Sequence, residues 1–210
     1  MDKKYQAYTD YLLKVNSHTN LTTITDPAEI EVKHFKDSLT VLDYIKEGDR
    51  VLDLGAGAGF PGIPLRIEKE FDLTLIDSVN KKVKFMNETI EILGLSKARA
   101  IHTRAEDYAK DHREGFDVVV SRAVANMATL SELCLPFVKV GGLFIALKGP
   151  KAEEEVKAAG NALDILGGEI IKMDKINLDG NERVNVLVKK VRSCKKTYPR
   201  GQNLPKRKPL

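Results

Sequence analysis

The sequence has 210 residues and a formal net charge of +4, from 34 Lys and Arg against 30 Asp and Glu. This length predicts one large domain, or one domain with an appendage, with a core of its own. Two cysteines, Cys134 and Cys194, are too few and too far apart for a disulfide framework or a zinc site, so we expect no metal and a reduced, cytoplasmic setting. The start lacks the apolar core of a signal peptide, and no apolar run is long enough to span a bilayer, so no membrane partner is expected.

Residues 1–47 are expected to form an N-terminal helical extension. Apolar side chains recur at helical spacing over residues 3–16, which predicts an amphipathic helix. A second helix is predicted from residue 27 to residue 45. Asp26 can cap it, Pro27 suits the first helical position, and a glutamate two residues later completes a capping box.

From residue 50 onward, short apolar runs alternate with amphipathic segments. The predicted strands are residues 50–54, 73–77, 99–102, 116–121 and 143–148. Helices are expected between most of them, the clearest over residues 79–93 with Gly94 as its stop. Another helix is expected after Pro150, ending before Gly167. Such alternation is typical of a parallel sheet that helices cover on both faces.

The pattern changes near the end of the chain. Residues 168–178 and 183–191 are rich in strand formers, and the short polar link at residues 179–182 is a hairpin signal. The final strand should therefore run antiparallel to its neighbour. Residues 48–192 are predicted to form a single α/β domain.

Residues 193–210 are predicted to be a basic tail. Ten Lys and Arg and no Asp or Glu lie between residues 183 and 210, which leaves 24 Lys and Arg against 30 Asp and Glu elsewhere. A basic tail on an acidic body indicates a polyanionic partner such as nucleic acid. The alternative is a solvated tail that only aids solubility.

The stretch GAGAGFPG, residues 55–62, contains four glycines between a predicted strand and a helix. Ligands of open α/β sheets bind at the carboxyl ends of the strands, and glycine lets a ligand lie against the main chain. A dinucleotide site would use the G-x-G-x-x-G spacing of Gly57, Gly59 and Gly62. An S-adenosylmethionine site would use the D-x-G-x-G-x-G spacing of Asp53, Gly55, Gly57 and Gly59.

Asp77, at the end of the second strand, fits both ligands, because a carboxylate there can accept hydrogen bonds from two ribose hydroxyls. The antiparallel end of the sheet favours a methyltransferase. Pro61 and Pro64 also hinder the smooth helix start that a pyrophosphate requires. Two alternatives stay open: an NAD(P)-dependent Rossmann oxidoreductase, and a non-catalytic RNA-binding assembly factor with a methyltransferase fold.

Six motifs stand in register along the chain: VLDLGAGAGFPGIPL, LIDSVNKKVKFM, HFKDSL, RAED, SRAVAN and NLTTI. By these motifs the chain resembles the bacterial small-subunit ribosomal RNA guanine-N7 methyltransferase family, also called glucose-inhibited division protein B. The ending KKTYPRGQNLPKRKP is similar to that of Gram-positive members. The resemblance covers nearly the whole chain.

The resemblance implies a Rossmann-like class I methyltransferase fold. Its sheet would have seven mostly parallel strands, an antiparallel final hairpin strand and the N-terminal helical extension. The implied reaction transfers a methyl group from S-adenosylmethionine to N7 of a loop guanine in 16S ribosomal RNA. The implied partner is 16S ribosomal RNA or an assembly intermediate of the small ribosomal subunit, and we expect a monomer. By position, the family's cofactor residues fall on Gly55, Phe60, Asp77, Ala105, Glu106 and Arg122.

The predicted chemistry needs no general base, and no catalytic base can be named. The lone pair of guanine N7 is free to attack, so catalysis can rest on proximity and orientation. Arg122 and Lys148 are candidates to orient the guanine through its O6. Neither cysteine is a good nucleophile candidate, because Cys134 lies in an apolar helical stretch and Cys194 belongs to the tail.

His34, Asp37 and Ser38 share one helix face. They form either a polar cluster at the mouth of the site or a local network that anchors the helix. The expected RNA contacts are His34, Lys195, Lys196, Arg200, Lys206, Arg207 and Lys208. A competing hypothesis has the tail fold back over the cofactor pocket, with Tyr198 and Arg200 as its lid.

Overall fold

The computed structural model describes residues 2–122 and 124–210. Within this part of the chain, seven strands form one sheet in the order β3-β2-β1-β4-β5-β7-β6. β7 is antiparallel to both of its neighbours, and the other pairs are parallel. The predicted fold class is thus confirmed. The strands are β1 Arg50–Leu54, β2 Asp72–Asp77, β3 Ala98–His102, β4 Phe116–Arg122, β5 Val138–Lys148, β6 Gly168–Leu178 and β7 Asn181–Lys190.

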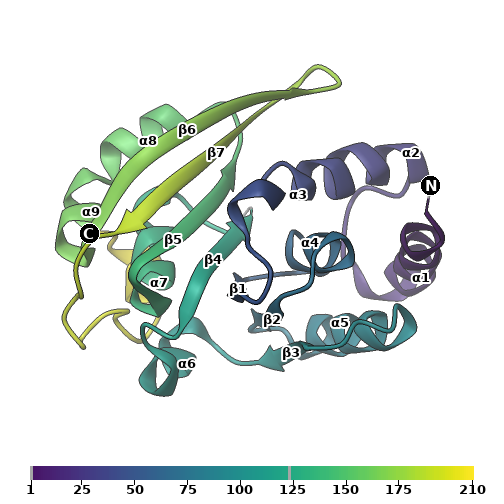
Figure 1. Ribbon diagram of the computed structural model, residues 1–210, viewed down its shortest axis with the longest axis horizontal. Helices are drawn as coiled ribbons and strands as arrows, with labels where there is room; N and C mark the ends of the chain where they lie inside the picture. Colours follow the sequence, from purple (N-terminus) through teal and green to yellow (C-terminus); the bar gives the residue numbers. More distant parts are fainter. Residues whose placement is uncertain (1, 123) are drawn as a thin grey trace.

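Alternate residues of each strand feed two separate hydrophobic clusters, one on each face of the sheet. Val51 and Leu73 belong to the cluster that includes the first group of helices, whereas Leu52 and Leu54 belong to the other. The first group is α1 Lys3–Thr19, α4 Gly62–Glu68 and α5 Asn80–Ile92. The second is α6 Ala105–His112, α7 Met127–Cys134, α8 Ala152–Ala158 and α9 Gly160–Leu166. The two groups lie on opposite sides of the central strands (Figure 1).

The helix predicted over residues 27–45 is not continuous, so that expectation was wrong in detail. It consists of α2 Pro27–Ile30, a π-helical turn η1 Glu31–Lys36, α3 Asp37–Leu39 and a 3₁₀ turn η2 Leu42–Tyr44. The backbone N–H of Asp37 bonds to the carbonyl of Val32, five residues back. Within this wider turn, the carbonyl of Lys33 accepts a hydrogen bond from the guanidinium of Arg122.

Two further element boundaries differ from the predictions. The helix expected after Pro150 is divided into α8 and α9 at Ala159, where ψ rises to 2°. β5 begins at Val138, earlier than predicted, because a register shift lets it pair with the start of β4. Gly94 and Gly167 do end helices with positive φ, as expected.

Residues 193–210, named the C-terminal segment below, pack against the second group of helices. The segment contains a short helix, α10 Leu204–Arg207, which contacts α7. Figure 1 shows it crossing from the end of β7 toward α6 and α7. This packing agrees with the competing hypothesis of a folded-back tail and not with a solvated one. The division of the chain at residue 193 stays a prediction. Among the described residues, no helix is long and apolar enough to cross a membrane.

Candidate functional site

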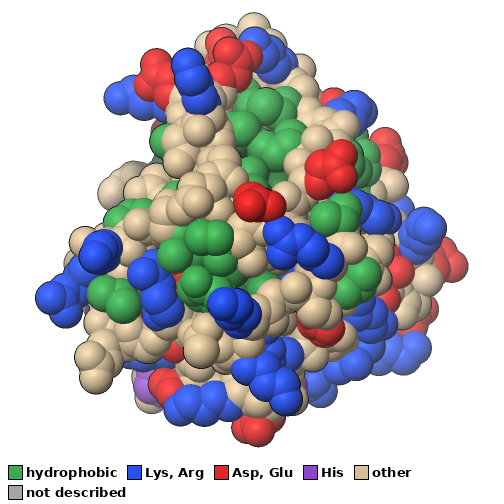
Figure 2. Space-filling model, turned by 90° about the vertical axis from the view of Figure 1, so that its left-hand side faces the viewer, with side chains coloured by type: hydrophobic (Ala, Val, Ile, Leu, Met, Phe, Trp, Pro, Cys, Tyr) green, Lys and Arg blue, Asp and Glu red, His purple; other side chains and the backbone are tan. Residues whose placement is uncertain are grey.

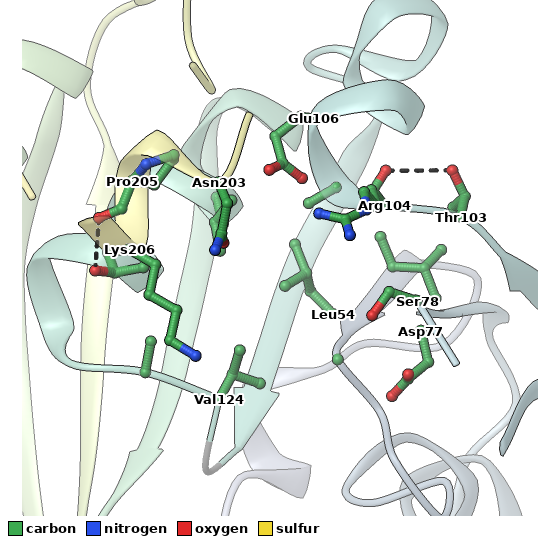
Figure 3. A pocket seen from close by; sticks show the side chains of 16 residues that line it. Leu54, Asp77, Ser78, Thr103, Arg104, Glu106, Val124, Asn203, Pro205 and Lys206 are labelled. Atoms are coloured by element: carbon green, nitrogen blue, oxygen red, sulfur yellow. Dashed lines mark hydrogen bonds between the residues drawn. The ribbon is translucent and has the colours of Figure 1, made fainter. Parts of the chain in front are cut away.

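A cavity of about 240 Å³ opens at the carboxyl ends of β1 and β2. Five parts of the chain line it: the glycine loop, the ends of β2 and β3, the start of α6, the turn after β4 with α7, and the C-terminal segment (Figure 3). Four of the residues predicted to bind a cofactor line this cavity: Gly55, Asp77, Ala105 and Glu106. This is the position expected for the ligand of an open α/β sheet.

The glycines of the loop have different physical roles. Gly55, Gly57 and Gly59 have φ of 72°, 61° and 90°, a left-handed region that disfavours side chains. A Cβ at Gly59 would lie 2.5 Å from Ile63 and 2.7 Å from the hydroxyl of Tyr8, so packing also demands glycine there. A Cβ at Gly57 would meet only the carbonyl of Gly55 at 4.0 Å. The backbone at Gly57 is therefore open to a ligand.

Asp53 supports the loop from behind and does not line the cavity. Its side chain is fully buried, and its Oδ2 accepts a hydrogen bond of 2.7 Å from the backbone N–H of Gly62. Its Oδ1 has no hydrogen-bond partner among the described residues. Burial raises the pKa of Asp53 to about 7, and the bond from Gly62 opposes that rise.

Asp77 connects the end of β2 to the glycine loop. Its Oδ2 accepts from the N–H of Gly57 at 3.0 Å, and its Oδ1 accepts from the N–H of Val79 at 2.9 Å. Each carboxylate oxygen can accept more than one hydrogen bond, so two ribose hydroxyls can still be bound. Asp77 lies at one side of the cavity, next to Ser78, in Figure 3.

Phe60 and Arg122, also predicted for the cofactor, do not line this cavity. The ring of Phe60 is buried between Tyr8, with centroids 5.3 Å apart, and His34, with centroids 4.5 Å apart. Arg122 lines a second cavity, of about 340 Å³, between η1 and the ends of β4 and β5. Its guanidinium turns that way because Asp37 and two acceptors on η1 bind it there.

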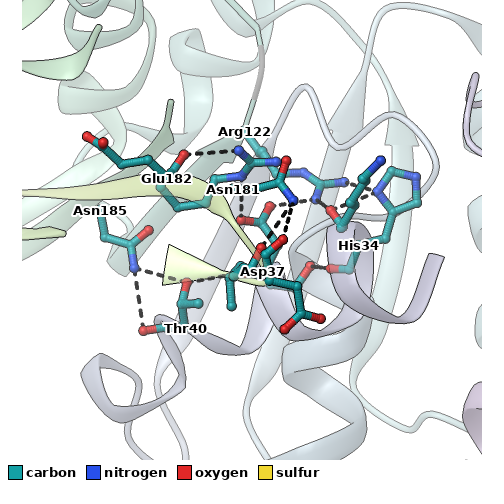
Figure 4. Close-up of polar contacts among 12 residues, drawn as sticks. His34, Asp37, Thr40, Arg122, Asn181, Glu182 and Asn185 are labelled. Carbon is teal, nitrogen blue, oxygen red and sulfur yellow. Dashed lines mark hydrogen bonds and ion pairs between the residues drawn. The ribbon is translucent and has the colours of Figure 1, made fainter. Parts of the chain in front are cut away.

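Arg122 joins the N-terminal helices to the central strand (Figure 4). Its Nη1 donates to Asp37 Oδ2 at 2.9 Å and to the carbonyl of Lys33 at 3.0 Å. Its guanidinium carbon lies 5.1 Å from the ring centroid of Phe60, a cation–π geometry. Arg183 donates to the other oxygen of Asp37 at 3.2 Å. The carboxylate of Asp37 is thus shared by two cations.

His34 belongs to the same network. Nδ1 of His34 lies 3.2 Å from Nη2 of Arg122 and 3.2 Å from the carbonyl oxygen of Lys33, and its Nε2 lies 2.9 Å from the hydroxyl of Thr22. Burial, with the charge of Arg122 second, lowers the pKa of His34 to about 4. The ring is therefore neutral near pH 7. This geometry favours an anchoring role over the predicted RNA contact, which stays a prediction.

Lys148 lies between the two cavities. Its Nζ donates to the carbonyl of Ala125, a residue of the first cavity, at 2.8 Å. It also lies 2.6 Å from Oε2 of Glu155 in the second cavity. Arg122 and Lys148 thus lie at the ends of the neighbouring strands β4 and β5, and their role in orienting a substrate stays a prediction.

The basic residues of the C-terminal segment are not equivalent. Arg200 pairs with the buried Glu132, and Lys206 lines the first cavity. Lys206 is nevertheless exposed, as are Lys195, Lys196, Arg207 and Lys208, which do not line the first cavity. Lys and Arg side chains spread over much of the face shown in Figure 2.

Neither Cys134 nor Cys194 lines either of the two cavities. Cys134 is buried, and burial raises the pKa of its thiol well above the ordinary value. Cys194 lies within 3.5 Å of Lys190 Nζ. Within residues 2–122 and 124–210, no group of three or more His, Cys, Asp or Glu is placed to bind a metal ion.

One side of the first cavity is formed by α7, which was not predicted to line a site, and by the C-terminal segment, which only the competing hypothesis of a folded-back tail brought to this pocket. Tyr198 and Arg200, the residues named in that hypothesis, do not line the cavity. Thr129 and Leu133 come from α7, and Asn203, Pro205 and Lys206 from the segment. The only signal in the sequence was the polar, proline-containing tail, which suits a solvated segment equally well. Position 123 of the SRAVAN motif lies outside the described residues.

Comparisons with known proteins show the family of the chain and a similar fold. A family model described as "rRNA small subunit methyltransferase G" matches residues 1–184. The "Ribosomal RNA small subunit methyltransferase G" of Lactobacillus helveticus is 47% identical over 217 residues, 99% of this chain and 90% of that protein. The protein of the same name from Clostridium novyi is 43% identical over 219 residues, 100% of this chain and 90% of that protein. A solved "SAM dependent methyltransferase from Aquifex aeolicus" has a TM-score of 0.60 and 21% identity, covering 81% of this chain and 96% of that one.

Proposed function

This chain belongs to the family of rRNA small subunit methyltransferase G, and we propose that it methylates N7 of a loop guanine in 16S ribosomal RNA. Its activity is that of an S-adenosylmethionine-dependent methyltransferase acting on ribosomal RNA of the small subunit. The proposal adds the acceptor atom and the residues of the site. We also propose a cytoplasmic location, which an acceptor in the ribosomal small subunit supports.

The first cavity would hold S-adenosylmethionine. Its amino-acid end would lie against the open backbone at Gly57, and its ribose hydroxyls would bond to Asp77. Ala105 and Glu106, at the start of α6, would face the adenine. Asp53 would act indirectly, because it fixes the start of α4 through Gly62. Bound there, the cofactor supplies an electrophilic methyl group.

The second cavity would receive the guanine. Arg122 and Lys148 line it and can donate to O6, the acceptor beside N7. N7 faces the deep, narrow major groove of A-form RNA, so the acceptor must lie in a loop or be extruded. No proton has to leave N7 before attack, so methyl transfer to N7 requires no general base.

One observation carries the proposal: two cavities flank the end of β4, and Lys148 contacts residues of both. The test is methylation of 16S ribosomal RNA or small subunits from cells lacking the enzyme. Treatment with borohydride and aniline should then cleave the RNA at 7-methylguanine. Methyl incorporation without new cleavage would reject N7. Binding of RNA without incorporation would support the non-catalytic assembly factor, and tight NADH binding without S-adenosylhomocysteine binding would support the oxidoreductase.

A further inference from the structure

The C-terminal segment supplies one wall of the first cavity. Asn203, Pro205 and Lys206 line it together with the glycine loop and the end of β2. In Figure 3 these residues lie across the cavity from Asp77, and the side chain of Lys206 extends toward Val124. Val124 in turn touches the glycine loop, because a Cβ at Gly55 would lie 2.5 Å from it.

A buried ion pair fixes this wall in place. The side chain of Glu132, on α7, has no exposed surface. Its two oxygens accept from Arg200 Nε at 2.8 Å and Nη2 at 2.6 Å, and Oε1 also accepts from the backbone N–H of Arg200 at 2.8 Å. A buried carboxylate is costly without such partners, so the folded protein strongly favours the docked segment.

Other contacts fasten the segment on either side of Arg200. Before it, Arg113 donates to the carbonyls of Cys194 and Lys195, each at 3.2 Å. After it, the hydroxyl of Thr129 donates to the carbonyl of Pro205 at 3.0 Å. Thr129 itself lines the cavity, so the anchor and the pocket share a residue.

The chemistry of the wall fits the cofactor. Among the described residues that line the cavity, Arg104 and Lys206 are the cations. Arg104 lies near the start of α6, whereas Lys206 extends toward the glycine loop (Figure 3). The amino-acid end of S-adenosylmethionine carries a carboxylate, and the amide of Asn203 can donate to and accept from a purine edge.

We propose that the C-terminal segment is part of the cofactor site, with the ammonium of Lys206 paired to the cofactor carboxylate and the amide of Asn203 facing the adenosine. This inference rests on the proposed function, since it assumes that S-adenosylmethionine occupies the cavity. It adds contacts from residues that lie beyond the stretch matched by the family model, residues 1–184.

Calorimetric titration of the full-length protein, without RNA, tests the proposal with two probes. S-adenosylhomocysteine carries the carboxylate, and 5′-methylthioadenosine lacks it. Lys206→Ala should weaken S-adenosylhomocysteine about tenfold and leave 5′-methylthioadenosine unchanged within about twofold. Asn203→Ala should weaken both probes by about threefold. Arg207→Ala is the matched control, because it removes the same charge from the same short helix at an exposed position.

The outcomes separate this inference from the function on which it rests. Wild-type protein that fails to bind S-adenosylhomocysteine would overturn both. Wild-type binding with Lys206→Ala indistinguishable from Arg207→Ala would overturn the carboxylate contact alone. Unchanged binding of both probes by Asn203→Ala would remove the adenosine contact. Thermal unfolding of each variant without ligand checks that the segment is still docked.

Discussion

Arg122 donates a hydrogen bond of 2.9 Å to Asp37, although 85 residues separate them in the sequence. The bond connects the end of the central strand β4 to the N-terminal helices. Both residues line the second cavity, which therefore exists only while those helices are docked. The second cavity and the stability of the N-terminal region are thus coupled through the ion pair of Arg122 and Asp37.

The first prediction concerns that pair. Arg122→Ala should lower the free energy of unfolding by about 2–4 kcal/mol, because it leaves the largely buried Asp37 with only Arg183 as a charged partner. The folded fraction of the variant should also lose methyl transfer, so the loss of activity should exceed what the lower stability explains. Binding of S-adenosylhomocysteine, which we propose occurs in the first cavity, should change by less than about twofold. Arg183→Ala, at a more exposed cation of the same carboxylate, should cost less. Loss of cofactor binding in a folded Arg122→Ala protein would return Arg122 to the cofactor site.

The second prediction concerns Asp77. Asp77→Ala should weaken S-adenosylhomocysteine by about 1.5–3 kcal/mol, because it removes charge-assisted bonds to the ribose. It also removes the acceptor for the N–H of Gly57. Asp77→Asn keeps an acceptor for that N–H and loses the charge, so its affinity should be intermediate. Titration calorimetry measures both variants, and equal affinity in wild type and Asp77→Ala would place the ribose elsewhere.

The third prediction concerns the buried carboxyl of Asp53. Burial raises its pKa from 3.8 to about 7, so the folded protein binds this proton more tightly than the unfolded chain. Its contribution to the free energy of unfolding is therefore greatest below pH 3.8 and falls by up to about 4 kcal/mol as the pH rises to about 7. Asp53→Asn should remove that part of the pH dependence. Denaturant unfolding at a series of pH values measures it, and parallel curves for the two proteins would contradict the assignment.

The residues of the first cavity that belong to local motifs could be predicted from the sequence. Gly55 directly follows β1 and Asp77 is the last residue of β2, so a strand prediction also places them at the edge of the sheet. The rest of the cavity depends on contacts between distant residues. Nothing near Arg200 indicates that it pairs with Glu132, and that pair sets where Lys206 lies. The π turn likewise lacks a local signal in the sequence, because the guanidinium that donates to its Lys33 carbonyl belongs to Arg122, at the end of β4.

The last prediction divides the basic residues of the C-terminal segment by their contacts. Lys195, Lys196, Arg207 and Lys208 are exposed and free to approach phosphates. Changing all four to Gln should flatten the slope of log affinity against log salt for single-stranded RNA by at most about 3, since each phosphate contact contributes about 0.7. Cofactor affinity should stay the same.

Arg200 should behave in the opposite way, because Glu132 already occupies its guanidinium. Arg200→Ala should leave the salt slope unchanged, weaken cofactor binding by undocking the segment, and lower the free energy of unfolding by about 3–5 kcal/mol. Combining it with Glu132→Gln should recover part of that stability, because the buried charge is then gone. A salt slope that flattens in Arg200→Ala as much as in a single exposed variant such as Lys196→Gln would mean that Arg200 leaves Glu132 to bind RNA. RNA binding by Arg200 would then require the C-terminal segment to leave the cofactor pocket, so the segment could not bind RNA and line the pocket at the same time.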